Sequence, residues 1–378
     1  MMPRLRRTLE FERLEDRTVP AGVLAVGSGA GVAPQVLLFH DSNNDGVPDG
    51  GPYAAMSVLS ANFRGGVRVA VGHFTGGSNL QLVVAAGPGG TPLVQVFQLD
   101  SNDLPTGAFE SFYAVGSGFN HGLFVARAHS QNAAFDSLVV TADAGGVPFV
   151  RIYNDAGGTG PFDHLLGNSL VDAFIAFGPG FRGGVRPAAG RNLLVFGSDF
   201  LALATGPGIA ARMMIVKDSN NNLAYSDNLG TREVFLPFGT GWTGGLNVAI
   251  GNVGSPSTNP ELIVSRDAGA NSRVLIFSDS NFDGFYSDDG GPASSFLAYD
   301  PGFTGGVRVA YSRLSPTNFG QVGEVIVMPV STARPVKIFR SQINTGEILD
   351  GDPPLAQFFP LGGNFIHGYF AAFGGNGV

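Results

Sequence analysis

Two short segments of the 378-residue chain space acidic and amide side chains in a pattern that suits calcium. The first, DSNNDGVPD (41–49), puts oxygen-bearing side chains at loop positions one, three, five and nine: Asp41, Asn43, Asp45 and Asp49. The second, DSNFDGFYSDD (279–289), fills the same positions with Asp279, Asn281, Asp283 and Ser287. A glycine stands at position six of both loops, and calcium prefers such a wrapped set of oxygen ligands around a tight turn. The spacing therefore predicts calcium in these loops.

A plain hairpin turn is the alternative interpretation of the same two loops. Neither loop has the glutamate that usually stands at position twelve, where Pro52 and Gly290 are found instead. Without it we expect weak binding, with a dissociation constant of about 10⁻⁴–10⁻³ M. Asn-Asp-Gly is itself a turn signal. The related segments 100–107 and 218–227 have lost the glycine or the register, which favours the plain turn.

Arginine recurs at one place in three copies of a repeated segment. Arg68, Arg186 and Arg308 each follow the residues Gly-Gly-Val. If the copies are arranged around an axis, alternate copies would carry a cation near that axis, and the ring could hold an anionic ligand. Pairing of each arginine with a neighbouring carboxylate or with backbone carbonyl groups is the alternative.

Other catalytic or metal-binding patterns were not found in the sequence. The chain has no cysteine, which excludes disulfides, thiolate metal sites and cysteine nucleophiles. His121 and His367 stand where the other copies have glycine, but no third ligand accompanies them, so zinc is not expected. Zinc-protease, serine-hydrolase and phosphate-loop motifs are absent, and no helix follows the spaced glycines of 27–31.

The repeated segment defines the organisation of the chain. Aligned on the first residue of the Gly-Gly pair, its copies start 56 to 62 residues apart, at Gly65, His121, Gly183, Gly244, Gly305 and His367. A second series of apolar runs ends at a similar spacing, at Phe39, Phe97, Tyr153, Val216, Phe277 and Phe339. Two independent series therefore agree on six repeats of about 60 residues, and internal repeats of this kind indicate a repeat architecture.

Each repeat contains four short strand candidates. In one repeat they are residues 122–128, 137–142, 148–153 and 170–177, rich in β-branched and aromatic residues and separated by Gly, Pro, Asn or Asp. No segment has convincing helical periodicity. Four strands repeated six times predict an all-β protein, a six-bladed β-propeller of antiparallel blades. We expect residues 22–378 to form this single domain, preceded by a separate leader over residues 1–21.

The phase of the repeat predicts how the ring closes. The first repeat lacks its opening strand, and the chain ends with a spare one at residues 368–374. We expect the two ends to share one blade, because closure removes sheet edges that would otherwise invite aggregation. The Gly-Gly pair is expected where a Cβ atom would clash. The aromatic residue two positions before the pair is expected to fill space between neighbouring blades.

Bulk composition excludes some classes of protein. The net charge is −8 and no basic patch stands out, so nucleic-acid binding is not expected. No stretch of about 18 apolar residues exists, so no membrane-spanning helix is expected.

The repeat resembles the FG-GAP/VCBS class of β-propeller repeats, in the version seen in planctomycete bacteria. The resemblance covers roughly residues 22–378 and is carried by words such as PGFTGGVRVA (301–310) and VVAAGPGGTPLVQVF (83–97). It implies an extracellular propeller, often supported by calcium, that serves adhesion or binding. The family's usual aspartate-rich loop after the VAVG strand is missing here, for example in HFTGGSNLQ (73–81).

The leader also carries a resemblance. FERLEDRTVPA (11–21) is similar to the N-terminal extracellular-targeting motif of planctomycetes, whose core is Leu-Glu-x-Arg-x-x-Pro. This implies an exported protein at the cell surface or outside the cell. The leader lacks the apolar segment of an ordinary secretory signal.

These features favour an exported, non-enzymatic and monomeric propeller that binds a protein or a polysaccharide at the cell surface or in the extracellular matrix. A carbohydrate-active hydrolase or lyase is one alternative, and it would need two or three carboxylates with an arginine at one mouth of the channel. A purely structural envelope protein is another, and it would have a dry, aromatic-filled channel without a pocket.

Overall fold

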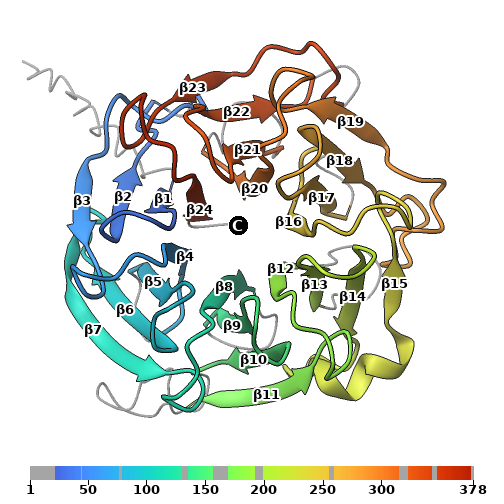
Figure 1. Ribbon diagram of the computed structural model, residues 1–378, viewed down its shortest axis with the longest axis horizontal. Coiled ribbons are helices and arrows are strands. Elements are labelled where there is room, and N and C mark those ends of the chain that lie inside the picture. The colour runs from blue at the N-terminus through green and yellow to red at the C-terminus, as the bar shows by residue number, and fades with distance from the viewer. Residues whose placement is uncertain are drawn as a thin grey trace, which may run out of the picture.

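Six four-stranded antiparallel sheets surround a central axis in the computed structural model (Figure 1). The structure describes residues 22–43, 45–75, 79–129, 135–155, 169–191, 199–254, 259–314, 322–342 and 347–375. Blade 1 contains β24, β1, β2 and β3, and blades 2 to 6 follow in chain order with four strands each, from β4–β7 to β20–β23. The predicted fold, a six-bladed β-propeller, is therefore confirmed.

The strands fall into four concentric sets. The inner strands, next to the axis, are β4 (Val67–Gly72), β8 (Leu123–Ala128), β12 (Val185–Arg191), β16 (Leu246–Gly251), β20 (Val307–Ser312) and β24 (Tyr369–Gly374). The second strands are β1 (Val23–Ser28), β5 (Gln81–Ala86), β9 (Ser137–Ala142), β13 (Asp199–Thr205), β17 (Glu261–Arg266) and β21 (Glu324–Pro329). The third strands are β2 (Gln35–Phe39), β6 (Leu93–Leu99), β10 (Phe149–Tyr153), β14 (Met213–Asp218), β18 (Arg273–Phe277) and β22 (Val336–Arg340). The outer strands are β3 (Ala54–Ser57), β7 (Pro105–Tyr113), β11 (Leu170–Ile175), β15 (Glu233–Phe235), β19 (Ser294–Leu297) and β23 (Ala356–Phe358).

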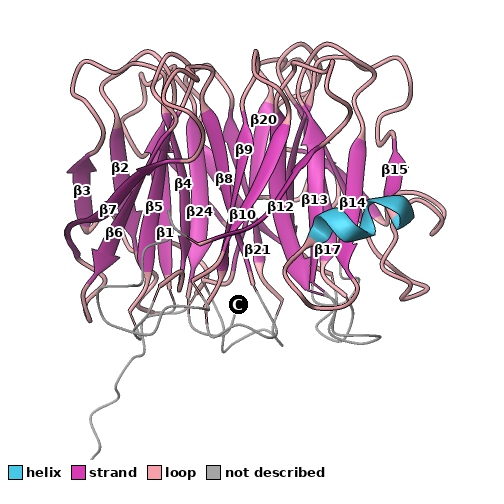
Figure 2. Ribbon diagram, turned by 90° about the horizontal axis from the view of Figure 1, so that it is seen from below, coloured by secondary structure: helices cyan, strands magenta, loops and turns pink. Residues whose placement is uncertain are grey.

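The two ends of the chain close the ring as predicted. Strand β24 pairs antiparallel with β1 in a register that runs from Val23 opposite Gly374 to Ser28 opposite Tyr369. Strand β24 thus supplies the inner strand that the first repeat lacks. The alternating direction of the strands gives the propeller two faces (Figure 2). We call the face where the inner strands begin the turn face, and the face where they end the loop face.

The core is divided into six apolar clusters, one between each pair of neighbouring blades. The cluster between blades 5 and 6, for example, joins Ile263 and Phe296 to Val309 and Val325. The second strands are buried along nearly their whole length, which explains their almost continuous apolar sequences. Each blade is therefore held by its two neighbours, and stability depends on an unbroken ring.

The second glycine of each Gly-Gly pair is required by the backbone. In all six repeats it has a positive φ of 69° to 91°: Gly66, Gly122, Gly184, Gly245, Gly306 and Gly368. A Cβ atom on Gly306 would also lie 2.4 Å from the backbone nitrogen of Ala268 in the preceding blade. The first position is less restrictive, because His121 and His367 occupy it in two repeats. The repeat therefore preserves the close approach of one blade to the next.

The aromatic residues before the glycine pair pack largely as expected. Phe303 belongs to the cluster between blades 5 and 6, and Phe119, Trp242 and Phe365 pack against the clusters of their own blades. One element was not predicted, the 3₁₀ helix η2 (Tyr225–Thr231) between β14 and β15. Its Tyr225 is fully buried between blades 3 and 4, so tertiary packing rather than helical periodicity holds this segment. None of the helices in the described ranges is long and apolar enough to cross a membrane.

Candidate functional site

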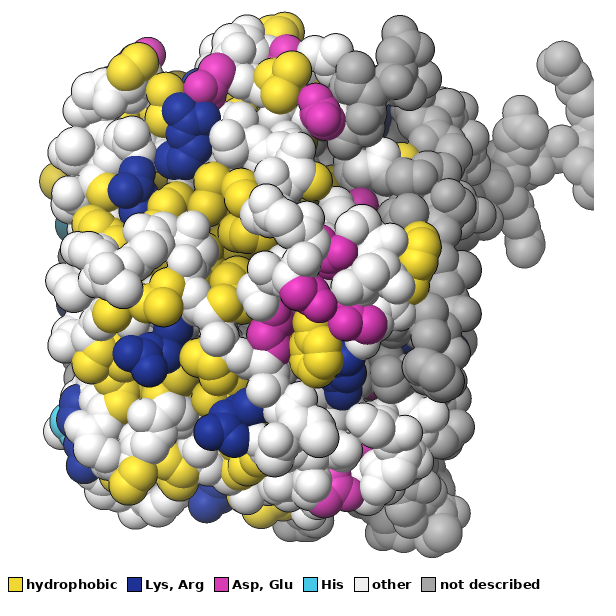
Figure 3. Space-filling model, turned by 90° about the vertical axis from the view of Figure 1, so that its right-hand side faces the viewer, with side chains coloured by type: hydrophobic (Ala, Val, Ile, Leu, Met, Phe, Trp, Pro, Cys, Tyr) yellow, Lys and Arg dark blue, Asp and Glu magenta, His cyan; other side chains and the backbone are white. Residues whose placement is uncertain are grey.

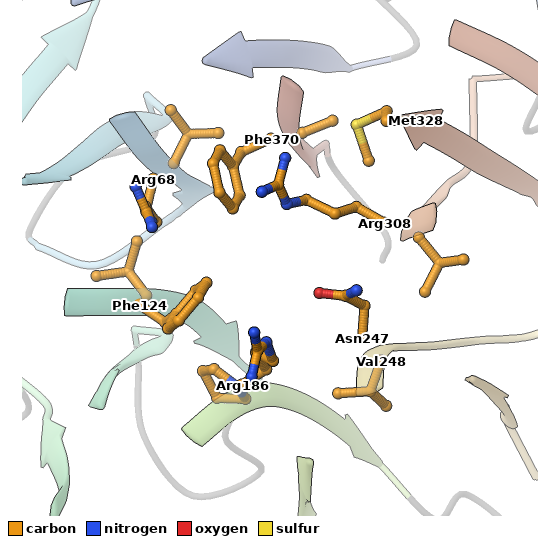
Figure 4. Close-up of a pocket in the computed structure, with 13 residues that line it drawn as sticks. Arg68, Phe124, Arg186, Asn247, Val248, Arg308, Met328 and Phe370 are labelled. Carbon is orange, nitrogen blue, oxygen red and sulfur yellow. The ribbon is translucent and has the colours of Figure 1, made fainter. Parts of the chain in front are cut away.

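The second residue of every inner strand faces the central channel, and together these residues surround a cavity of about 100 Å³ (Figure 4). In blade order from 1 to 6 they are Phe370, Arg68, Phe124, Arg186, Asn247 and Arg308. We call this set the channel ring. The three arginines come from alternate blades, as the repeat predicted. The ring lies near the turn face, because each member stands one residue into its strand.

Aromatic faces hold the arginines of the channel ring in place. The Arg308 guanidinium lies 3.8 Å from the ring centroid of Phe370, and the Arg68 guanidinium lies 4.3 Å from the same centroid. Arg68 and Arg186 lie 5.0 and 5.5 Å from the ring of Phe124. Such cation–π contacts stabilise a buried guanidinium and restrict its orientation. Cations and aromatic rings therefore alternate around the channel.

Two of the three arginines are neutralised by aspartates of the following blade. Arg68 Nη2 lies 2.6 Å from Asp143 Oδ2, and Arg186 Nη2 lies 2.8 Å from Asp267 Oδ2. The other oxygen of each carboxylate accepts a hydrogen bond from the next backbone N–H, at 2.7 Å for Asp143 and 3.0 Å for Asp267. This is the carboxylate pairing that the sequence left open. The arginine contact and the backbone hydrogen bond together fix both carboxylates at the turn face.

Arg308 has no such partner. Gly29 of blade 1 stands where blades 3 and 5 carry Asp143 and Asp267, and no carboxylate in the described part of the chain forms an ion pair with Arg308. Its Nη1 instead donates to the backbone oxygens of Tyr369 and Val330, at 3.1 and 3.3 Å. Burial lowers the pKa of Arg308 to about 9, which still leaves it protonated at neutral pH. Three guanidiniums and two carboxylates thus give the site a formal charge of +1.

Several donors at this site are left without acceptors. Within the described ranges, Nε and Nη1 of Arg186 and Nε of Arg68 are buried and have no hydrogen-bond partner. Leaving a buried donor unsatisfied costs about 1–3 kcal/mol, and more when the group is charged. A small anion in the cavity would supply the missing negative charge beside these three guanidinium groups. The channel ring is therefore a candidate anion site.

Sequence reasoning found the three arginines but missed the rest of the site. Phe124, Phe370 and Asn247 occupy the same repeat position as the arginines, and the alignment of repeats already places them together. Asp143 and Asp267 lie 75 and 81 residues after their partners. The sequence feature that could have revealed them is that each aspartate stands in the repeat directly after a repeat with an arginine. The cavity and its arginines do not fit the dry, pocket-free channel of the purely structural alternative.

The two predicted calcium loops lie on the opposite, loop face, where the third strands end. In the first loop, the side chain of Asp41 accepts hydrogen bonds from the N–H groups of Gly46 and Asp45, at 2.6 and 3.2 Å. Asp49 accepts one from the N–H of Ser42, at 2.5 Å. Burial, reinforced by the nearby carboxylates, raises the pKa of Asp41. These contacts account for the loop as a turn built on its own backbone.

The second loop differs in two buried atoms. Asp279 Oδ2 accepts from Gly284 N–H and Asn259 Nδ2, at 2.8 and 2.6 Å. Asp279 Oδ1 and Asp289 Oδ2, however, are buried without a hydrogen-bond partner in the described ranges. Burial raises the pKa of Asp279, and the carboxylates of Asp283 and Asp289 add to the effect. Acidic side chains gather on this side of the molecule near one rim (Figure 3).

No group of three or more His, Asp or Glu side chains in the described ranges is placed to hold a metal ion. The related loop 218–227 shows which residues this loop conformation needs. Asp218 accepts from the N–H groups of Asn222 and Leu223, at 3.1 and 2.8 Å, and Leu223 takes the glycine position with a φ of 68°. The loop conformation thus forms without the glycine at position six.

The sheet arrangement and the channel ring define this protein as a six-bladed β-propeller with a cationic channel. No protein-family model matches the chain, and no curated protein does. Among solved structures it is similar to Sqt1 from Chaetomium thermophilum bound to the N-terminus of the ribosomal protein L10, with a TM-score of 0.43 and 12% identity over 91% of this chain and 73% of that one. It is also similar to the dihydro-heme d1 dehydrogenase NirN in complex with DHE, with a TM-score of 0.41 and 10% identity over 96% of this chain and 77% of that one.

Proposed function

We propose that the protein is a non-enzymatic binding propeller that holds an anionic group of its ligand in the channel ring. The observation that carries this proposal is Arg308, a half-buried guanidinium that has no carboxylate partner in the described part of the chain and lines a cavity of about 100 Å³. A buried charge is costly unless it is paired. A ligand that brings an anion to the channel relieves that cost, and the relief contributes to its affinity.

Binding is favoured over catalysis by the way in which the carboxylates are held. Asp143 and Asp267, together with the arginines, resemble the composition expected of a carbohydrate-active site. Each is nevertheless engaged on both oxygens, by an arginine and by its own backbone. A general acid or base must be able to reach a substrate proton. Carboxylates fixed in this way serve better to position the arginines.

The resemblance to FG-GAP/VCBS propellers supports a place for this binding at the cell surface or in the extracellular matrix. The partner would then be a protein or a polysaccharide that bears acidic groups, bound by a single exported chain. The export motif itself lies within residues 1–21, outside the described residues. Sequence resemblance, and not the geometry of the site, supports this part of the proposal.

Replacing Arg308 tests the anion site directly. We expect calorimetric titration with sodium propionate or sodium sulfate to detect binding to the unmodified protein. The Arg308→Met variant should bind that anion at least about tenfold more weakly, because hydrogen bonds to charged groups contribute about 1.5–3 kcal/mol. Methionine fills similar space with an apolar chain, so the propeller should keep its melting temperature or gain slightly.

Arg334→Met is the matched control for that experiment. Arg334 belongs to the same blade but is half-exposed outside the channel, where it pairs with the exposed Asp300 at 3.0 Å. The control should bind the anion as the unmodified protein does. Equal binding by the Arg308 and Arg334 variants, or no binding by the unmodified protein, would refute the proposal.

We also propose weak calcium binding in the second loop, 279–289, where Asp279 Oδ1 and Asp289 Oδ2 offer buried oxygens. With a dissociation constant of about 1 mM, calcium at about 10 mM would stabilise the fold by about 1.4 kcal/mol. We expect this calcium-dependent rise in melting temperature to disappear in Asp279→Asn. It should persist in Asp218→Asn, where both oxygens are already hydrogen-bonded. An identical calcium response in all three proteins would rule out this loop.

A further inference from the structure

We infer that the channel ring selects a singly charged carboxylate carried on a small apolar body, in preference to doubly charged anions. This inference rests on the proposed anion binding and specifies which anion is bound. Three properties of the site lead to it: the balance of charges, the chemistry of the lining, and the reason why one aspartate is missing.

The balance of charges favours a single negative charge. Asp143 and Asp267 each cancel one arginine at 2.6 and 2.8 Å, so only the charge of Arg308 is unmatched. One carboxylate makes the site neutral. A sulfate or a hydrogen phosphate dianion would leave an excess negative charge next to the buried Asp143 and the half-buried Asp267, and uncompensated charge away from water is strongly disfavoured.

The lining favours a carboxylate over a spherical or fully polar ion. Arginine presents a planar fork of donors that matches the two oxygens of a carboxylate. The rest of the cavity is apolar and is lined by Val69, Val125, Val248, Val309 and Met328. Since one water needs about 10–15 Å³ of such space, a cavity of about 100 Å³ accommodates a carboxylate with a short hydrocarbon chain. Such a ligand matches both the arginine donors and the apolar lining of the cavity.

A glycine without room for a side chain stands in place of the missing aspartate. At Gly29 an added Cβ atom would lie 1.7 Å from the backbone oxygen of His367, so this backbone has no room for any side chain. Blades 3 and 5 carry Asp143 and Asp267 at the corresponding place. Blade 1, which joins the two ends of the chain, thus supplies no carboxylate to Arg308. The excess charge belongs to the architecture rather than to a mobile surface group.

We expect the unmodified protein to prefer propionate to sulfate, and we expect removal of one aspartate charge to reverse this preference. In titrations at equal ionic strength, the unmodified protein should bind propionate at least about tenfold more tightly than sulfate, since like charges placed side by side in a buried site repel strongly. Asp267→Asn raises the formal charge of the site to +2 and keeps an oxygen that can accept from Arg186. This variant should bind sulfate more tightly than propionate. Asp143→Asn should reverse the order in the same way.

The outcomes separate this inference from the proposed function. Arg308→Met should weaken the binding of both anions. If sulfate binds the unmodified protein as tightly as propionate, or if neither aspartate variant changes the order, the selectivity is wrong while the anion site stands. If neither anion binds in a way that depends on Arg308, the proposed function fails. Circular dichroism and melting curves of Asp267→Asn and Asp143→Asn show whether each variant is folded, and one folded variant is enough for the comparison.

Discussion

A chain that ends before residue 366 is expected to lose cooperative folding at ambient temperature or to melt more than about 10 °C lower. Strand β24 contributes Tyr369, which is fully buried, and Phe373, which is nearly so, to the cluster between blades 6 and 1. Full burial of such side chains contributes about 1.5–3 kcal/mol each, and six backbone positions of β1 would lose their partners. A typical protein has only about 5–15 kcal/mol of total stability.

The missing strand also changes what the protein exposes. Strand β1 would become an open sheet edge with an apolar sequence, which favours aggregation. Thermal denaturation followed by circular dichroism, together with light scattering, measures both effects. A synthetic peptide of residues 366–378 added to the truncated protein should restore part of the lost stability, because the strand is held by noncovalent pairing. An unchanged melting curve after truncation would show that the ring does not depend on this closure.

Replacing Gly306 with alanine is expected to destabilise the protein by about 3 kcal/mol or more. Two costs add at this position. Its φ of 78° is left-handed, which costs an L-residue about 1–2 kcal/mol. The new Cβ atom would also lie 2.4 Å from Ala268 N and 2.8 Å from the carbonyl carbon of Asp267, so blade 6 would have to move away from blade 5. Asp267 pairs with Arg186, so the channel ring should be disturbed as well.

Two other glycines, Gly239 and Gly302, allow these two costs to be measured separately by urea denaturation. Gly239 has a similar φ of 74° but no atom within 4 Å of an added Cβ, so Gly239→Ala should lose only the conformational cost of about 1–2 kcal/mol. Gly302 has open space and no left-handed φ, and Gly302→Ala should be nearly neutral. Equal losses for Gly306→Ala and Gly239→Ala would mean that backbone conformation alone, and not the contact between blades, maintains the repeated glycine.

The repeat allowed the architecture to be predicted, because six equivalent segments constrain one another. The spacing placed the strands within a residue or two, as for residues 137–142, which form β9 (Ser137–Ala142). The surplus strand at residues 368–374 predicted the pairing of β24 with β1. The helix η2 could not be predicted, because its Tyr225 is held by partners in two blades rather than by a local pattern.

The candidate site was predicted only in part. The repeat placed Arg68, Arg186 and Arg308 around the channel, because equivalent residues of a propeller surround its axis. It did not say which arginine is neutralised, since that depends on contacts across neighbouring blades. Only the structure pairs Arg68 with Asp143 and leaves Arg308 against backbone oxygens. The calcium interpretation of loops 41–49 and 279–289 stays a prediction.

A crystal structure of the full chain grown in propionate tests the central claim most directly. We expect electron density for the carboxylate on the propeller axis, with its oxygens in hydrogen-bond contact with Arg308 and its hydrocarbon chain against the apolar lining. The same density should be missing from crystals of Arg308→Met. A channel that holds only water in propionate, or propionate bound solely elsewhere on the molecule, would contradict the account.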